Sequence, residues 1–170
     1  MKKIMNTKRL CRAGIIAALY VALTYAFAPF AFGPLQIRPA EALCILALLY
    51  PEAIPALYVG CMLSNLSSPY LVYDVFIGSL ATLTAAVVTY VVGKFVKKTP
   101  VKLILGGLPP VLFNALIIPL IIVLLCGGGE DFSSAYIAYF TYAGSIALTQ
   151  AVWVYGLGIP LYFTVVKLKL

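Results

Sequence analysis

Almost all basic residues in this chain are confined to short clusters, and the segments between the clusters are largely apolar. Eleven of the twelve lysines and arginines fall into three clusters, at residues 2–12, 94–102 and 167–169. Hydrophobic residues make up 64% of the 170-residue chain and charged residues only 10%. Soluble domains rarely contain uncharged apolar runs of about 20 residues, whereas a helix of that length crosses a bilayer. The sequence therefore predicts an all-α, multi-pass protein of the cell membrane.

The net charge of +7 fits this membrane topology better than binding to nucleic acid. The basic clusters flank apolar segments, and loops rich in lysine and arginine stay on the cytoplasmic side of a membrane. If all three clusters are cytoplasmic, an even number of crossings separates each cluster from the next. This parity predicts about six transmembrane helices, both termini cytoplasmic, and no nucleic-acid partner. The expected segments are residues 13–32, 40–50, 53–66, 75–93, 103–126 and part of 132–166, from about 145 to 166.

The second and third segments are short for transmembrane helices. A twelve-residue α-helix covers only about 18 Å of a hydrocarbon core that is about 30 Å thick. These segments are expected either to span the membrane or to form a re-entrant hairpin, and the parity holds in both cases. Residues 36–41, 65–74 and 127–131 would then lie outside the cell. Because no Ser/Gly-rich linker interrupts the chain, residues 1–170 are expected to form a single transmembrane domain.

The sequence lacks the residue patterns that are typical of metal sites, disulfide frameworks and phosphate-binding loops. The chain has no histidine, and its four cysteines are scattered without a Cys-x-x-Cys pair, so neither a metal site nor a disulfide framework is expected. It also lacks the Gly-x-x-x-x-Gly-Lys-Ser/Thr loop that cradles nucleotide phosphates. We therefore expect no cofactor and no enzymatic activity in this chain alone.

Polar residues at the ends of the apolar segments are candidates for binding a substrate, since each is costly near lipid unless it is paired or solvated. Arg38 and Glu41 stand together before the second segment, where they could instead cap a helix and pair with each other. Asp74 could likewise cap the fourth helix, and Asn65 could simply end the third.

The last two segments contribute three more candidates. Asn114 lies near the middle of the fifth segment, where an unpaired amide costs about 1–3 kcal/mol, so it either contacts a ligand or joins two helices. Gln150 is expected in the outer half of the last span, with Trp153 on the same face. Trp153 could stack on a flat heterocycle or anchor the helix at the membrane interface. The predicted substrate-binding residues are Arg38, Glu41, Asn65, Asp74, Asn114, Gln150 and Trp153.

Two helices carry stripes of small residues spaced by four, which allow another helix to approach closely. The partner of the first stripe could be another helix of this chain or a separate membrane subunit, and at least one stripe is expected to be internal. The first stripe is Gly14, Ala18, Ala22 and Ala26, and the second is Ala81, Ala85, Thr89 and Gly93.

Three segments within residues 10–95 resemble the QueT family of queuosine-precursor carriers. They are Gln-Ile-Arg-Pro-Ala-Glu-Ala-Leu at 36–43, Ala-Ile-Pro-Ala-Leu-Tyr-Val-Gly-Cys at 53–61, and the stretch 73–83 with Asp-Val-Phe-Ile-Gly-Ser-Leu-Ala-Thr. The resemblance implies an S component, the substrate-binding subunit of an energy-coupling factor (ECF) transporter. It also implies a transmembrane coupling subunit docked on the first stripe, two ATPase subunits, and surrounding membrane lipid.

A 7-deazaguanine such as queuine would suit the candidate residues. Its N–H and amine groups can donate to Glu41 or Asp74, its carbonyl can accept from Asn114 or Gln150, and Trp153 or a tyrosine can stack on the ring. Three alternatives stay open at this level: an S component for another vitamin such as riboflavin or thiamine, a small intramembrane enzyme using Glu41 and Asp74 as acid and base, and a structural subunit.

Overall fold

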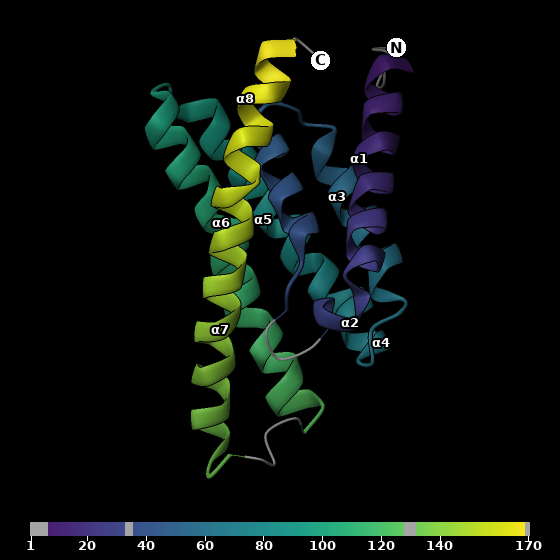
Figure 1. Cartoon of the computed structure of the whole chain (residues 1–170), viewed down its shortest axis with the longest axis vertical. Coiled ribbons are helices and arrows are strands. Elements are labelled where there is room, and N and C mark those ends of the chain that lie inside the picture. The colour runs from purple at the N-terminus through teal and green to yellow at the C-terminus, as the bar shows by residue number, and fades with distance from the viewer. Residues whose placement is uncertain (1–6, 33–35, 128–131, 169–170) are drawn as a thin grey trace.

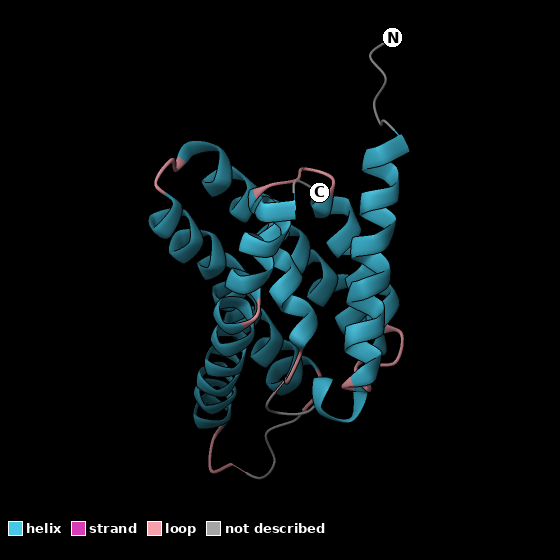
Figure 2. Ribbon diagram, turned by 45° about the horizontal axis from the view of Figure 1, so that its top comes forward, coloured by secondary structure: helices cyan, strands magenta, loops and turns pink. Residues whose placement is uncertain are grey.

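The protein is a bundle of long, roughly parallel and antiparallel helices (Figures 1 and 2). The computed structural model describes residues 7–32, 36–127 and 132–168, and within these ranges it contains helices, turns and loops but no strand. The predicted all-α class is therefore confirmed. The elements are α1 (Thr7–Ala26), α2 (Ala28–Ala31), η1 (Pro39–Leu48), α3 (Ala53–Asn65), α4 (Leu71–Tyr73), η2 (Asp74–Gly78), α5 (Ser79–Phe95), α6 (Thr99–Leu120), η3 (Ile121–Leu125), α7 (Ala135–Gly156) and α8 (Gly158–Leu168).

Four continuous helical stretches in the described residues are long and apolar enough to cross a membrane. They are Thr7–Ala26, Leu71–Phe95, Thr99–Leu125 and Ala135–Leu168. The two remaining apolar helices, η1 and α3, are shorter. All six predicted apolar segments are thus helical, while a count of six complete crossings stays a prediction.

The second predicted segment is a 3₁₀-helix rather than an α-helix, and it occupies the centre of the bundle. All ten residues of η1 are buried, and the helix contacts α1, α3, α5, α6, α7 and α8. A 3₁₀-helix rises about 2.0 Å per residue, so η1 covers about 20 Å. Residues three apart stack along its length, which aligns Glu41 with Cys44. A helix that is apolar on every side is stable only when other helices surround it.

Glycines let two neighbouring helices close on the end of η1. A Cβ on Gly93 of α5 would lie 2.6 Å from the Leu48 carbonyl oxygen, and a Cβ on Gly106 of α6 would lie 2.5 Å from a Leu48 methyl group. The atoms that face Gly93 are rigid backbone, so only glycine permits this packing there, whereas a side chain at position 106 would require the Leu48 side chain to move. The second small-residue stripe, which ends at Gly93, therefore packs inside the protein: Ala81, Ala85 and Thr89 are all buried.

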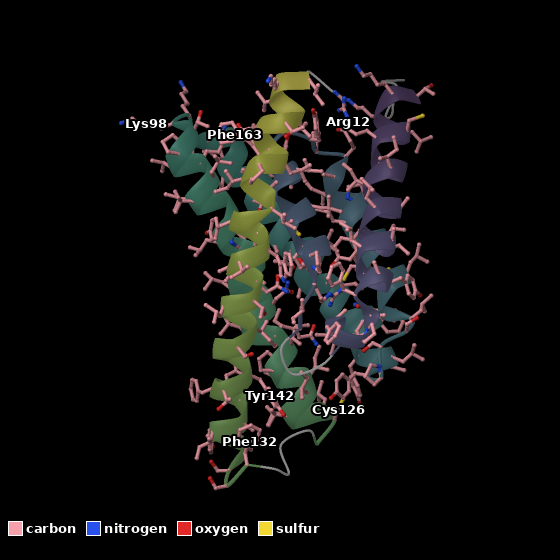
Figure 3. All side chains as sticks on the ribbon, in the orientation of Figure 1. Arg12, Lys98, Cys126, Phe132, Tyr142 and Phe163 are labelled. Carbon is pink, nitrogen blue, oxygen red and sulfur yellow. The ribbon has the colours of Figure 1, made fainter. Side chains whose placement is uncertain are left out.

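The basic clusters gather at the end of the bundle that holds both termini. Figure 3 places Arg12 and Lys98 at this end, and Cys126 and Phe132 at the other. Arg12 also binds Glu52 in the turn between η1 and α3, with 2.6 Å between Nη1 and Oε1. This shared end is what the predicted parity requires, although Lys2, Lys3, Lys169, Glu130 and Asp131 lie outside the described residues.

Three predicted helix limits differ from the structure. The first helix begins at Thr7 and stops at Ala26, because Pro29 in the first turn of α2 forces a new helix to start. The helix that corresponds to the fourth predicted segment starts at Leu71 rather than Val75. The last begins at Ala135 and is interrupted only at Leu157, three residues before Pro160, so it is far longer than the predicted 145–166.

Candidate functional site

Arg38 is the centre of a cluster of buried polar side chains in the half of the bundle away from the termini. Its Nη2 donates to the Tyr20 hydroxyl at 3.2 Å, to Asn65 Oδ1 at 3.1 Å and to Cys61 Sγ at 3.6 Å. The Tyr20 hydroxyl donates in turn to Glu41 Oε1 at 2.5 Å. The cluster thus joins α1, η1 and α3, with Arg38 placed immediately before η1.

Asn65 connects Arg38 to a second acid, Asp74. The Asn65 amide donates to the backbone carbonyl of Asp74 at 2.7 Å, and the Ser68 hydroxyl donates to Asp74 Oδ2. Asp74 begins the π-helical turn η2, in which the same carbonyl also accepts from the N–H of Ser79, five residues on. Single π-helical turns are frequent at functional sites because they redirect the side chains around them.

One basic and two acidic side chains of this cluster are almost completely removed from solvent. The exposed fractions are 3% for Arg38, 0% for Glu41 and 2% for Asp74. Arg38 Nε lies 4.0 Å from Glu41 Oε1, which is at the limit of a salt bridge. One guanidinium thus faces two carboxyl groups. Charges buried this deeply are costly unless their hydrogen bonds are satisfied.

Several hydrogen-bonding atoms of the cluster are not satisfied. Among the described residues, Arg38 Nε, Asp74 Oδ1 and Ser79 Oγ are buried and lack a hydrogen-bond partner, as does Gln150 Oε1 in α7. Such atoms are rare in folded proteins, and each calls for an explanation. Together they offer one donor, two acceptors and one hydroxyl that can act as either. This is the set of groups that a polar ligand would satisfy.

The structure brings together four of the seven predicted substrate-binding residues: Arg38, Glu41, Asn65 and Asp74. Asn65 does end α3, as the helix-stop alternative expected, but its side chain also bridges Arg38 and Asp74. The helix-capping alternative for Asp74 was wrong, because the helix already starts at Leu71. Glu41 hydrogen-bonds with Tyr20 and Cys44 side chains rather than capping backbone N–H groups.

No hydrogen bond or ion pair joins the other three predicted residues to Arg38 in the described structure. Asn114 is buried on α6, one turn before Ile118, whose Cδ1 would lie 3.7 Å from a Cβ on Gly78 of η2. Gln150 is buried near the middle of the continuous helix Ala135–Leu168, because that helix begins at Ala135 and not near residue 145. Trp153 packs against Phe27, with ring centroids 6.2 Å apart.

Sequence reasoning missed several side chains of the cluster, of which Tyr20 is the most important. Tyr20 is one of twelve tyrosines in the chain, and nothing next to it in sequence marks it. The available signal was its position between Ile16 and Thr24, which form one buried face of α1 at a spacing of four. No comparable spacing pattern in the sequence indicates a binding role for Ser68, Ser79 or Cys61.

The first small-residue stripe faces away from the bundle. Gly14, Ala18, Ala22 and Ala26 are all exposed, whereas the buried face of α1 carries Tyr20. A Cβ on Gly14 would meet no heavy atom within 4 Å. The stripe therefore lies on the outer, exposed side of α1 in the described chain.

The cluster around Arg38 coincides with segments that are typical of one transporter family. The family model described as QueT transporter matches residues 10–167. The chain belongs to the QueT transporter family. Membership places it in a family of transporters and not of enzymes, and agrees with its four membrane-length helices.

A curated relative from the same family shares part of the sequence. It is named Queuosine precursor transporter QueT, comes from Lactococcus lactis subsp. cremoris (strain MG1363), and is 39% identical over 85 residues. The matched region covers 49% of this QueT-family chain and 49% of the relative. No solved structure matches the chain.

Proposed function

We propose that this chain is the S component of an ECF-type importer and captures a queuosine precursor in the Arg38 cluster. The observation that carries the proposal is the set of buried, unsatisfied polar atoms on Arg38, Asp74 and Ser79. The relative from L. lactis is named for a queuosine precursor, which supplies the substrate class.

A 7-deazaguanine base complements the unsatisfied atoms. Its ring N–H and exocyclic amine are neighbouring donors, and the free Oδ1 of Asp74 accepts from one of them. Its carbonyl accepts from Arg38 Nε, the free donor. A precursor that carries an additional amine would balance the excess of one carboxylate over the single guanidinium, with Glu41 as the second acid.

Gln150 and Asn114 are proposed to complete the site from the α6–α7 side. Gln150 is buried with a free carbonyl oxygen, and Asn114 is buried on α6. In this arrangement the base lies between the Arg38 cluster and these two amides. Trp153, which packs on Phe27, would close the site beside α2 rather than bind a polar edge of the base.

Energy coupling is proposed to come from partner subunits. The exposed stripe of α1 would dock on the transmembrane coupling subunit, and two ATPase subunits would hydrolyse ATP. Because Tyr20 lies on the buried face of the same helix, α1 connects the substrate cluster to this docking face. Both termini are proposed to be cytoplasmic, with the Arg38 cluster in the outer half of the membrane.

Calorimetric binding of queuine and its 7-deazaguanine precursors to the detergent-purified protein tests the substrate proposal. Removing the charge of Asp74 with Asp74→Asn is expected to weaken binding about 10- to 100-fold, as is Glu41→Gln, because a hydrogen bond to a charged group contributes about 1.5–3 kcal/mol. Glu52→Gln is the matched control, since Glu52 is also buried but lies at the opposite end of the bundle.

Each outcome of this titration has a distinct meaning. Tight binding that Asp74→Asn loses and Glu52→Gln keeps supports the site. Binding of riboflavin or thiamine in place of the 7-deazaguanines would keep the S-component proposal and reject the substrate. If the well-folded protein binds none of these compounds, the proposal of substrate capture fails.

A further inference from the structure

An apolar groove lies between α1, η1 and α8 at the end of the bundle that carries the termini. Its apolar lining includes Ile15 and Leu19 of α1, Leu43 and Leu46 of η1, and Leu161 of α8, and we name it the α1–α8 groove. Its volume is about 480 Å³. No residue of the Arg38 cluster lines it, so the groove is not part of the candidate substrate site. A groove with such walls is poorly solvated by water and well suited to hydrocarbon.

Basic side chains border this groove. Lys8 and Arg12 line it together with the apolar residues. Arg12 is already paired with Glu52 at 2.6 Å and stacks on the Tyr50 ring, 3.9 Å from its centroid. Lys8 is exposed and forms no ion pair with a described residue. The groove therefore combines a hydrocarbon-like body with an uncompensated positive charge, and it has no acidic residue in its lining.

The length of the groove matches one leaflet of a bilayer. From Lys8 to Leu19 the α1 helix rises about 16 Å. Half of a hydrocarbon core about 30 Å thick is about 15 Å. An acyl chain that starts at the level of Lys8 would therefore reach the level of Leu19 near the bilayer midplane, with its headgroup beside the basic residues.

We propose that the α1–α8 groove binds one anionic phospholipid of the leaflet at the basic end, with an acyl chain in the groove and the headgroup phosphate at Lys8. Basic pockets between helices on the cytoplasmic side of a membrane favour anionic headgroups in this way. The bound lipid lies next to the exposed stripe of α1, since Ile15 and Leu19 each follow a stripe residue. This inference depends on the membrane location of the bundle and not on the proposed substrate.

A second groove supplies an internal comparison. It lies between α6 and α8, has a volume of about 610 Å³, and is lined by Ile104 and Phe163 among other uncharged residues. Figure 3 shows Phe163 near Lys98 at the same end of the bundle. This groove is larger but contains no basic side chain in its lining. It should therefore accept lipid chains without preference for an anionic headgroup.

Native mass spectrometry of the detergent-purified protein with phosphatidylglycerol or phosphatidylcholine of identical chains tests the proposal. Wild-type protein is expected to prefer phosphatidylglycerol. Lys8→Gln should reduce that preference about fivefold, the effect of one lysine near a membrane surface. Ile15→Trp should fill the groove and reduce binding of phosphatidylglycerol by at least the same factor.

Two controls match these variants. Lys98→Gln removes an exposed lysine at the same end of the bundle but outside either groove lining, and Ile104→Trp enlarges a residue of the second groove. Ile15 and Ile104 are both 60% exposed, so the two tryptophans are comparable. Neither control should change the preference for phosphatidylglycerol.

The proposal is overturned if wild type shows no preference, or if each control reduces the preference as much as its partner variant. It is also overturned if Ile15→Trp keeps lipid binding but prevents copurification with a coupling subunit. In that case the groove receives a protein helix and not a lipid.

Discussion

At the scale of single residues, Tyr20 is the hydrogen-bonding hub of the cluster. Its hydroxyl is fully buried, donates to Glu41 and accepts from Arg38. A ligand N–H that binds Glu41 Oε1 must therefore compete with the Tyr20 hydroxyl. Cys44 also donates its thiol to the other carboxylate oxygen of Glu41 at 3.3 Å, so Glu41 has both oxygens engaged in the ligand-free protein. Asp74, with one free oxygen, is the acid that is ready to accept.

Replacing Tyr20 by phenylalanine is expected to separate stability from binding. Tyr20→Phe leaves Glu41 Oε1 without its donor, which should lower the free energy of unfolding by about 1–3 kcal/mol. A ligand that donates to Glu41 would no longer compete, so its affinity should be unchanged or higher. Thermal unfolding with and without a 7-deazaguanine measures both effects.

Tyr25→Phe is the matched control for Tyr20→Phe. The Tyr25 hydroxyl is exposed and accepts from Ser67 at 2.9 Å, so its removal should change unfolding by less than about 0.5 kcal/mol. Equal destabilisation by both variants would contradict the role given to Tyr20. A large loss of affinity in Tyr20→Phe would show instead that the hydroxyl contacts the ligand.

At the scale of elements, α1 presents different chemistry on its two sides. Its inner side meets α3 closely: a Cβ on Gly60 would lie 2.9 Å from Tyr20 Cβ. Its outer side is the exposed stripe of small residues. Tyr20 of α1 packs closely on α3 and hydrogen-bonds with Glu41 and Arg38. A shift of α1 on partner docking would therefore change these hydrogen bonds. We infer that this pairing links substrate capture to the docking face.

Enlarging the stripe is expected to block docking without disturbing the fold. Ala18→Leu and Ala22→Leu add side chains to an exposed face, so ligand affinity should be unchanged while copurification with the ECF coupling subunit falls at least about tenfold. Gly144→Leu is the control, because Gly144 is exposed on α7 and a Cβ there would meet nothing within 4 Å. Undiminished copurification of the Ala18→Leu protein would mean that the stripe only faces lipid.

At the scale of the whole molecule, charge and polar clusters occupy different parts of one bundle. Arg12 and Lys98 lie at the end that holds the termini, and Cys126 and Phe132 lie at the other (Figures 1 and 3). The Arg38 cluster lies toward the end without the termini, where η1 begins and α3 finishes. The positive-inside rule predicts that the cluster lies toward the outside of the cell.

Cysteine labelling in intact cells tests this orientation. In a background with Cys11→Ser and Cys126→Ser, a cysteine at Ser133 should react with a membrane-impermeant thiol reagent, because Ser133 is exposed at the end away from the termini. A cysteine replacing Lys98 should react only after the membrane is permeabilised. The reverse pattern would place both termini outside and reject the proposed direction of transport.

Local sequence was sufficient to identify the helices, the membrane class, the single basic end and the segments that hold Arg38, Glu41, Asn65 and Asp74. Hydropathy, charge clusters and turn residues are properties of contiguous residues, so they can be read without knowing what packs against them. The sequence did not predict the helix break before Pro29.

Only the tertiary structure decided which polar groups meet and which faces are covered. Tyr20 and Glu41 are 21 residues apart in sequence, and Arg38 and Asn65 are 27 apart, so no local pattern could pair them. The two stripes of small residues look alike in sequence, yet one packs inside the bundle and the other is exposed. The 3₁₀ form of η1 likewise depends on burial by six neighbouring helices. Contacts between distant parts of the chain, which local propensity does not encode, determined these features.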